Sequence, residues 1–557
     1  MPRSHQRLVA RFVRVTKPYW TSDSRWRGLA LLGTTLLLVC AVNAINVTLG
    51  YVAERFMTAL TTKNIGNFYQ MLGWYGVTFA IATPVVVLYF YMGDKLALTW
   101  RGWLTAHYTR RYFARRAYYH INNARHIDNP DERIAQDVRE FTKYAINFLL
   151  TVVGSIITFC SFVTILWRIS HVLVVVVIAY ATVGTVLTLW FGRRLIGLNF
   201  DQMRHEADLR YHLIHVRNHR ESIAFYRGEE PEQKRIMQRI GEVVLNFNLV
   251  IGWQRNLGFI KTTYDYLIVL IPSLVIAPLY FSGKIEFGVI TRADMAFAQI
   301  LAALSIVVAQ FRTFSEFMAQ VDRLGELDEG LDEPEEPAAT AVGVTEGEAG
   351  VAFEHVTLQT PQGDRALVEN LDMDVTAGGS LLIMGPSGCG KSSLLRLLAG
   401  LWKNGTGSIR RPPMHEVAFL PQRPYMVLGT LREQLAYPHA AERYTVAELE
   451  DALIRCGLPK LLSRVGGLDA HLQWEDVLSL GEQQRLAFAR LSLELPRFVI
   501  LDEATSALDV ENEERLYHML AESGVTYISV GHRPSLRNFH KRVLQLDGTG
   551  GWTLSSP

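Results

Sequence analysis

The chain contains 557 residues, which is enough for at least two domains. Its formal net charge of +2 excludes a strongly basic or acidic protein, and nucleic acid is not expected as a partner. Four distant cysteines have neither the spacing of metal ligands nor that of a disulfide framework. Hydrophobic residues make up 49% of the chain and form long runs within residues 1–320, whereas the remainder is typical of a soluble domain.

Residues 1–27 are basic and amphipathic. Five Lys or Arg residues between Arg3 and Lys17 alternate with apolar side chains, which predicts a helix lying in the cytoplasmic interface of a membrane. No cleavable signal peptide is expected, because the first apolar run is too long for the hydrophobic region of such a peptide.

Residues 28–326 are predicted to form an all-α transmembrane domain. Six runs are long and apolar enough to cross a bilayer: 28–51, 71–92, 146–167, 172–191, 262–281 and 294–315. The long segments 94–145 and 192–261 between them have a helical composition, so we expect them to continue the spans into the cytoplasm.

The distribution of basic residues predicts the topology. Residues 1–27 contain seven Lys or Arg residues, and the two long segments are also rich in them. The three alternate loops contain only Arg55, Lys63, Arg168, Lys284 and Arg292. This asymmetry places both termini in the cytoplasm. The basic and aromatic run 110–119 is interpreted as the ordinary interfacial belt rather than as a nucleic-acid site.

Two polar stretches interrupt the long segments. In the stretch 129–134, Pro130 is expected to restrict Asn129 to an extended conformation and to open a new helix. The stretch 221–229 is comparable, and both suit short coupling elements between long helices. Residues 327–350 are acidic and rich in Pro, Ala and Gly, which predicts a solvated linker before a domain at 351–557.

Polar residues within the spans are candidates for a transport pathway. Asn43 and Asn46 lie three residues apart on one helical face, and Asp265 lies near the cytoplasmic end of the fifth span. An ionisable residue inside a membrane is a functional hypothesis by default. The alternative is that the asparagines only form hydrogen bonds between helices.

A phosphate loop is indicated at residues 385–392, which read G-x-x-x-x-G-K-S. The loop follows the apolar run 380–384 and precedes a leucine-rich helical stretch, the context that such a loop requires. Its glycines allow backbone N–H groups to surround phosphates at a helix N-terminus. Lys391 is expected to reach the β- and γ-phosphates, and Ser392 to supply an oxygen to Mg²⁺.

Four further elements follow the loop in order. Gln422 comes after the apolar strand 417–420, where its amide can touch Mg²⁺ or the attacking water. Ser479 is placed as the N-cap of a helix whose exposed start offers a second phosphate-binding surface. Asp502 and Glu503 end the strand 498–501, as a Mg²⁺ partner and as the residue that orients or deprotonates the water. His532 follows the strand 527–530, where it can report on the γ-phosphate.

With these residues in place, 351–557 resembles the nucleotide-binding domain of an ABC transporter, an α/β P-loop NTPase. The motifs are Walker A at 385–392, Q-loop Gln422, signature LSLGE at 478–482, Walker B ending at Asp502, catalytic Glu503, the D-loop 506–509 and switch His532. The resemblance implies ATP and Mg²⁺ as cofactors, with Ser392, Gln422 and Asp502 at the metal. It implies these nucleotide contacts: Gly385, Pro386, Ser387, Gly388, Cys389, Gly390, Lys391, Ser392, Ser393, Ser479, Gly481, Glu482 and Asp509.

The six spans are similar to one ABC membrane domain of exporter-like architecture. The stretches NPDERI, ESIAFYRGE and PQRPYMVLGTLREQLAYP resemble subfamily D, and also bacterial relatives of the SbmA/BacA type with a fused ATPase. Two positions depart from the pattern. Leu480 replaces the usual signature glycine, and Thr360-Pro361 stand where a tyrosine often stacks on adenine, so loose selectivity for ATP over GTP is expected. Cys389 in the phosphate loop predicts sensitivity to thiol alkylation.

The resemblance implies a homodimeric pump with two composite ATP sites, since one chain carries one signature and six spans. The expected cargo is peptides or bulky hydrophilic solutes such as cobalamin, imported across a bacterial inner membrane. Transport of fatty acids or acyl-CoA is an alternative, and a non-pumping channel or regulator is another.

Overall fold

The structure is a computed structural model that describes residues 2–123, 127–306, 310–332, 341–347, 350–360, 363 and 365–556. Contacts within the chain divide it into two units, Met1–Glu333 and Pro334–Pro557.

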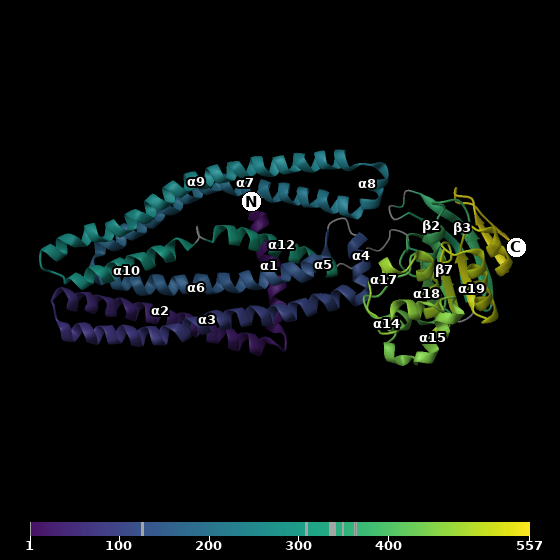
Figure 1. Cartoon of the computed structure of the whole chain (residues 1–557), viewed down its shortest axis with the longest axis horizontal. Helices are drawn as coiled ribbons and strands as arrows, with labels where there is room; N and C mark the ends of the chain where they lie inside the picture. The colour runs from purple at the N-terminus through teal and green to yellow at the C-terminus, as the bar shows by residue number, and fades with distance from the viewer. Residues whose placement is uncertain are drawn as a thin grey trace. The chain divides into compact units, whose positions relative to one another are not determined.

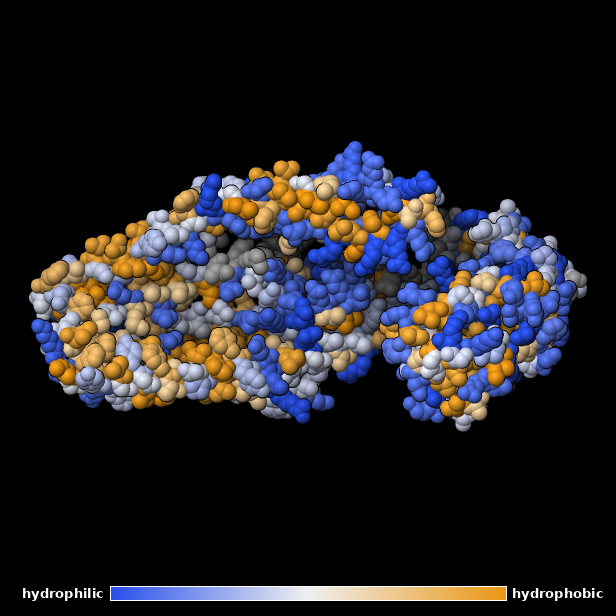
Figure 2. Space-filling view, in the orientation of Figure 1, coloured by the Kyte–Doolittle hydropathy of each residue, from blue (hydrophilic) through white to orange (hydrophobic). Residues whose placement is uncertain are grey.

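The first unit consists of helices, several of them very long (Figure 1). The helices are α1 (Pro2–Thr21), α2 (Arg25–Thr61), α3 (Ile65–Phe113), α4 (Ala117–Asn123), α5 (Pro130–Glu132), α6 (Val138–Ile169), α7 (His171–Asn218), α8 (Arg220–Tyr226), α9 (Glu229–Phe281), α10 (Phe287–Leu304) and α12 (Phe311–Asp332). Helix α2 packs along α3, α7 packs along α9, and α10 packs against α2 and α6. Figure 2 shows apolar side chains covering the end of this unit that carries the α2–α3 and α9–α10 turns.

Among the described residues, six helical segments are long and apolar enough to cross a membrane. Four of these segments contain predicted spans, and the whole of helix α7 contains a fifth. Helices α3, α7 and α9 extend well beyond the spans, as predicted. The sixth prediction, 294–315, is wrong in its bounds, because α10 begins at Phe287 and ends at Leu304. A turn follows at Ser305, so one continuous helix does not cover the predicted range.

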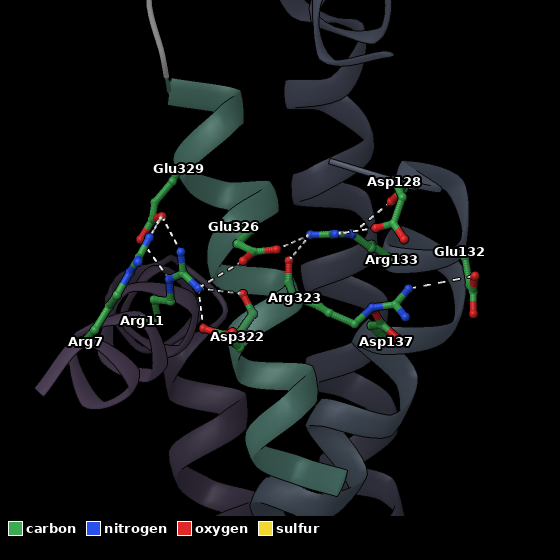
Figure 3. Close-up of polar contacts among 10 residues, drawn as sticks. All are labelled: Arg7, Arg11, Asp128, Glu132, Arg133, Asp137, Asp322, Arg323, Glu326 and Glu329. Atoms are coloured by element: carbon green, nitrogen blue, oxygen red, sulfur yellow. Dashed lines mark hydrogen bonds and ion pairs between the residues drawn. The ribbon is translucent and has the colours of Figure 1, made fainter. Parts of the chain in front are cut away.

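Ion pairs join helix α1 to α12 (Figure 3). Arg11 is only 3% exposed, and its guanidinium contacts Glu329 through two hydrogen bonds of 3.0 and 2.7 Å. Asp322 forms a further ion pair with Arg11. These contacts raise the pKa of Arg11 and lower the pKa of Glu329. The predicted interfacial helix therefore turns part of its basic face toward the protein, where the acidic residues of α12 supply partners.

The predicted linker begins later than residue 327. Helix α12 continues to Asp332, because Leu327 is fully buried and Asp328 is paired with Arg14 and Arg111. The acidic composition of this stretch therefore reflects ion pairing on a helix, not solvation alone.

The break near residue 129 differs from the prediction in one respect. Helix α5 does begin at Pro130, but Asn129 has φ +43° and ψ +60°, in the left-handed region rather than the extended one. Asparagine tolerates this conformation better than most residues. A π-helical turn, Arg133–Asp137, leads into α6.

Arg133 fixes this turn to α12 (Figure 3). It is 2% exposed, and its guanidinium pairs with Asp128 at 2.6 Å and with Glu326 at 3.3 Å. Glu326 also lies 3.5 Å from Arg11, so one carboxylate of α12 joins both buried arginines.

The second unit contains two sheets. The four-stranded sheet has the order β1 (Gly343–Glu346), β5 (Gly405–Arg411), β2 (Gly350–Gln359) and β3 (Ala366–Thr376). The six-stranded sheet has the order β10 (Trp552–Ser555), β9 (Arg542–Leu546), β4 (Ser380–Met384), β8 (Thr526–Val530), β7 (Phe498–Asp502) and β6 (Val417–Leu420). In the larger sheet every neighbouring pair is parallel except β10 with β9.

Helices pack around the six-stranded sheet. They are α13 (Lys391–Leu398), α14 (Leu431–Ala436), α15 (Val446–Arg455), α16 (Leu461–Val465), α17 (Trp474–Val477), α18 (Leu480–Leu493) and α19 (Val510–Glu522). Strands β4, β7 and β8 are almost wholly buried, which agrees with their continuous apolar sequences. Because β4, β6, β7 and β8 are parallel, the loops that follow them meet at one edge of the sheet.

Candidate nucleotide site and transport pathway

The phosphate loop lies between β4 and α13, as predicted. Gly385, Gly388 and Gly390 all have positive φ values, of 152°, 78° and 103°, which side-chain-bearing residues rarely adopt. At Gly385 a Cβ atom would also lie 2.6 Å from the carbonyl oxygen of Leu546. Lys391 begins α13, and its ammonium group donates to the carbonyl oxygens of Gly385 at 2.9 Å and Pro386 at 2.8 Å. The lysine charge is thus held inside the curve of the loop.

Oxygen ligands suitable for a divalent cation lie beside this lysine. The Ser392 hydroxyl donates to an Asp502 carboxylate oxygen at 3.1 Å, which joins the loop to the end of β7. Burial raises the pKa of Asp502, and the neighbouring Glu503 adds to the rise. Additional positive charge at this carboxylate would therefore be favourable. A serine hydroxyl and a carboxylate are the kind of hard oxygen donors that Mg²⁺ prefers, so the residues fit that ion.

Glu503 is held from two sides. The Gln422 side-chain amide donates to one carboxylate oxygen of Glu503 at 2.9 Å, and His532 Nε2 lies 3.0 Å from the other. Glu503 has φ +50°, a conformation of elevated energy that is frequent at functional sites. Its N–H donates to the carbonyl oxygen of Val530, which secures this backbone. The loops after β6, β7 and β8 thus bring together three residues predicted as catalytic.

The signature segment forms the start of α18. Ser479 is the N-cap, and it makes a reciprocal capping box with Glu482. Burial alone would raise the pKa of Glu482, but Arg464 and the hydrogen bonds from Ser479 lower it. The carboxylate of Glu482 is therefore engaged within its own helix start. Among the described residues, no hydrogen bond or ion pair links the signature to the phosphate loop of the same chain.

Asp509 is engaged in a similar way. Its carboxylate caps α19 by accepting from the Asn512 N–H at 2.8 Å and from the Asn512 side chain at 2.9 Å. These hydrogen bonds lower the pKa of Asp509. Glu482 and Asp509 therefore have local structural partners in addition to any role at a nucleotide.

In the first unit, Asn43 and Asn46 line a cavity of about 290 Å³ between α2, α3, α6 and α10. The Asn43 amide donates to the Ser161 hydroxyl at 2.7 Å, and its carbonyl oxygen is buried without a hydrogen-bond partner. Asn43 thus joins two helices and faces the cavity. Asp265 is exposed and lines neither this cavity nor its neighbour, so the structure does not bring it together with the asparagines.

The neighbouring cavity has a volume of about 410 Å³ and shares Tyr89, Leu150 and Thr151 with the first. Apart from Gly93, the rest of its lining combines aromatic and polar side chains: Phe90, Asp94, Tyr144, Asn147, Phe148, Gln310, Thr313, Phe314 and Phe317.

Comparison with known proteins shows to which family this chain belongs. Residues 16–281 match the ABC transporter transmembrane region 2 model, and residues 368–506 match the ABC transporter model. An uncharacterized ABC transporter ATP-binding protein of Synechocystis is 48% identical over 96% of this chain and 82% of its own length. The chain belongs to the ABC transporter family.

This half-transporter is homologous to subfamily D. It is 39% identical to the chloroplastic ABC transporter D family member 2 of Arabidopsis thaliana, over 97% of this chain and 86% of the relative. It is 33% identical to the lysosomal cobalamin transporter of Mus musculus, over 100% of this chain and 97% of the relative. A bacterial Atm1-family ABC exporter with ATP bound shares the fold, with a TM-score of 0.76, 18% identity and 96% coverage of both chains. The transporter therefore combines a membrane domain with an ATP-hydrolysing domain.

The similarity to subfamily D confirms that part of the sequence interpretation. The finer resemblance to the SbmA/BacA type stays a prediction. Of the two residues that replace the adenine-stacking tyrosine, Pro361 lies outside the described residues.

Cys389 lies in the apolar core and not on the surface of the phosphate loop. It is 2% exposed and packs in the cluster that includes Leu394 and Leu546. This burial argues against the expected sensitivity to alkylation, because only an accessible thiolate reacts readily.

Sequence reasoning missed two polar residues of the ATPase domain. Gln484 is fully buried on α18, and Arg533 follows the switch histidine and donates to the carbonyl oxygens of Ser506 and Leu508. A glutamine on the mainly apolar buried face of α18 was the available signal, since a buried amide requires partners.

Proposed function

We propose that this transporter uses ATP to import peptides or bulky hydrophilic solutes such as cobalamin, by alternating access as a homodimer. The observation that carries the cargo proposal is the lining of the two cavities. It contains one carboxylate, Asp94, together with amides, hydroxyls and aromatic rings, and none of its described residues is Lys or Arg. Neutral or cationic polar cargo suits this lining.

An acyl-CoA suits the same lining less well. Its phosphates would bring several negative charges toward Asp94 without a basic partner, and an unpaired buried charge is costly. The kinship with a cobalamin transporter supports the same choice, because that relative's name describes a large polar cargo.

The ATPase residues are proposed to act as follows. The phosphate loop and Lys391 bind the nucleotide phosphates, and Ser392, Asp502 and Gln422 hold Mg²⁺, which would neutralise charge on the phosphates when bound. Glu503 orients or deprotonates the attacking water, while Gln422 and His532 fix its two oxygens. Such catalysis depends mainly on position and charge, which agrees with a site assembled from three adjacent strand ends.

A second copy of the chain is proposed to complete each site. The signature, with Ser479 and Gly481, makes no polar contact with the phosphate loop of its own chain among the described residues. Closure of one chain's signature on its partner's phosphate loop would create two equivalent sites. A purified monomer that hydrolyses ATP at the full rate would contradict this.

The proposed home is a bacterial inner membrane, with both termini in the cytoplasm. The uneven distribution of Lys and Arg among the loops supports this orientation. Labelling cysteines introduced at the two ends of the chain in sealed cells tests it, and ends labelled from opposite faces would overturn it.

The function itself is tested by uptake into proteoliposomes with ATP on the side of the ATPase domains. Cobalamin, a cationic peptide and an acyl-CoA are compared, with the Glu503→Gln protein as the control. ATP-dependent accumulation of the first or second cargo is expected. Accumulation of acyl-CoA alone would replace the proposal by the fatty-acid alternative, and downhill flux that Glu503→Gln does not change would indicate a channel.

A further inference from the structure

Gln484 occupies a central place between two loops of the ATPase domain. It lies in α18, one helical turn after the N-cap Ser479, and its side chain is 0% exposed. Its amide nitrogen donates to the backbone carbonyl of Gln422 at 3.0 Å and to the Ser506 hydroxyl at 3.3 Å. Its amide oxygen accepts from the N–H of Ala507 at 3.0 Å. One buried amide thus bonds both the loop after β6 and the loop after β7.

Each of these loops is also bonded to Glu503. The Gln422 side chain donates to the Glu503 carboxylate at 2.9 Å, while the Gln422 carbonyl is held by Gln484. The Ser506 N–H donates to the Glu503 carbonyl at 3.0 Å. The side chain and the backbone of Glu503 are therefore reached through two separate partners of Gln484.

The other side of Glu503 follows the same arrangement. His532 contacts its carboxylate at 3.0 Å, and the next residue, Arg533, donates to the Ser506 carbonyl at 3.0 Å. Arg533 also lies 3.4 Å from Glu513, which is 1% exposed. The loop 506–508 is thus held by Gln484 on one side and by Arg533 on the other.

Packing alone does not account for a glutamine at this position. Apart from Ser492, the other buried side chains of α18 are apolar, such as Leu486 and Phe488, and need no partners. A buried amide must satisfy its hydrogen bonds, and each unsatisfied group costs about 1–3 kcal/mol. A displacement of residues 506–507 would therefore carry Gln484 and the carbonyl of Gln422 with it.

We propose that Gln484 is a positioning residue that couples the loop 506–508 to Gln422, and so sets the geometry of Glu503. This inference rests on the proposed roles of Gln422 and Glu503. In the homodimer, contact of the partner with the loop 506–508 would reach Glu503 through this amide. Gln484 touches neither nucleotide nor water in this scheme, so it affects the rate of hydrolysis and not the binding of ATP.

The test compares two buried glutamines of the same domain in the full-length protein in proteoliposomes. Gln484→Met removes the hydrogen bonds at nearly constant side-chain length. Gln434→Met is the matched control, because Gln434 is also 0% exposed and accepts from Val427 and Arg490, each at 2.9 Å. Among the described residues, no hydrogen bond joins the Gln434 side chain to Gln422, to Glu503 or to the loop 506–508. Both variants should therefore lose similar thermal stability.

Only Gln484→Met is expected to lower kcat, by about 10- to 100-fold, because small misplacements of catalytic groups have effects of this size. Its KM for ATP and its binding of a fluorescent ATP analogue should stay within about twofold of the parent values.

An unchanged kcat in Gln484→Met would overturn the proposal, as would equal losses of kcat in Gln484→Met and Gln434→Met. The Glu503→Gln protein is assayed in parallel. If that protein hydrolyses ATP normally, the proposed catalytic roles fail. If it is inactive while Gln484→Met is normal, only the coupling role of Gln484 fails.

Discussion

In the ATPase domain the candidate catalytic residues follow successive parallel strands, whereas in the membrane domain the cavity residues come from separate helices. Gln422, Glu503 and His532 stand directly after β6, β7 and β8, which are neighbours in the sheet. Asn43 and Tyr89 line one cavity from α2 and α3, and residues of α6 and α10 complete it.

The difference lies in what fixes each arrangement. Hydrogen bonds between strands set the positions of the loops in the ATPase domain, so a short motif after a strand implies a place in space. Helices in a membrane domain can rotate and shift with little change in their apolar patterns. Short sequence motifs therefore predict the positions of the ATPase residues. The residues that contact cargo depend on how the helices pack, which such motifs do not show.

The largest effect is expected for Glu503→Gln, which tests whether a motif after a strand identifies the catalytic residue. The substitution keeps the shape of the side chain but removes its charge, so hydrolysis should fall by about 100-fold or more while ATP binding is retained. Steady-state ATPase activity and nucleotide trapping in proteoliposomes measure the two properties. Substantial turnover in this variant would show that the motif order does not identify the catalytic residue.

Arg133→Met tests whether the buried ion pairs of Arg133 stabilise the membrane domain. Arg133 is buried and pairs with Asp128 and Glu326, so its removal should lower the free energy of unfolding by about 1–3 kcal/mol. Arg139→Met is the matched control. Arg139 is half exposed, and among the described residues its one ion pair is with Glu140, at 2.8 Å. Such a surface pair contributes about 0–1 kcal/mol.

Thermal unfolding of the two variants in detergent measures this difference. Equal midpoints would show that the charged cluster of α1, α12 and the π-helical turn does not stabilise the domain. A larger loss in Arg133→Met would show that ion pairs with Asp128 and Glu326 anchor the π-helical turn to α12.

Sequence patterns predicted the strands that precede the nucleotide motifs and the start of α18. The strands at 380–384 and 417–420 have the predicted bounds, and Ser479 is the predicted N-cap. The fully buried Gln484 was not predicted, since its partners belong to loops that precede and follow α18 by many residues. Local sequence cannot show which distant carbonyl a side chain meets.

In the membrane domain, the sequence predicted most of the spans but not the side-chain contacts between helices. Hydropathy identified five spans and misplaced the end of the sixth, because apolar residues continue past the turn at Ser305. Arg11 was assigned to the membrane surface, since its acidic partners Asp322 and Glu329 are 311 and 318 residues away in sequence. A hydrogen bond from Asn43 to another helix was one of the two expectations, but its partner, Ser161, was not predicted, because it depends on how α2 and α6 pack.

The buried residue His540 should make the stability of the ATPase domain depend on pH. Its ring is buried between the Ser529 hydroxyl, at 2.9 Å, and the Leu536 carbonyl, at 2.7 Å. Burial lowers the pKa of His540 from 6.5 to about 4, so the folded domain holds this ring neutral. Between these values the unfolded chain binds more protons, and stability should fall as the pH decreases from 6.5 toward 4.

The loss should approach about 3 kcal/mol near pH 4, because each unit of pKa difference corresponds to about 1.4 kcal/mol. Hydrogen exchange of β8 and β9 in the full-length protein measures it within the ATPase domain. His540→Gln should reduce the pH dependence, while His518→Gln on the exposed face of α19 should not. The same slope in all three proteins would place the titration elsewhere.

The smallest expected effect concerns Asp94, which lines the larger cavity, set against Asp265, which lines neither. Asp94→Lys should weaken stimulation of the ATPase by a cationic peptide about 3- to 10-fold in concentration, because reversing one partly solvated charge changes the interaction by about 1 kcal/mol. Asp94→Asn should have about half that effect in free energy, and Asp265→Lys should have none, while basal hydrolysis stays unchanged in all three. ATPase titrations with the peptide and with uncharged cobalamin separate charge from shape, since only the peptide should respond. If Asp265→Lys instead has the larger effect, cargo passes along the exposed face of α9. The one residue that the sequence selected in the fifth span would then describe the pathway better than the cavities do.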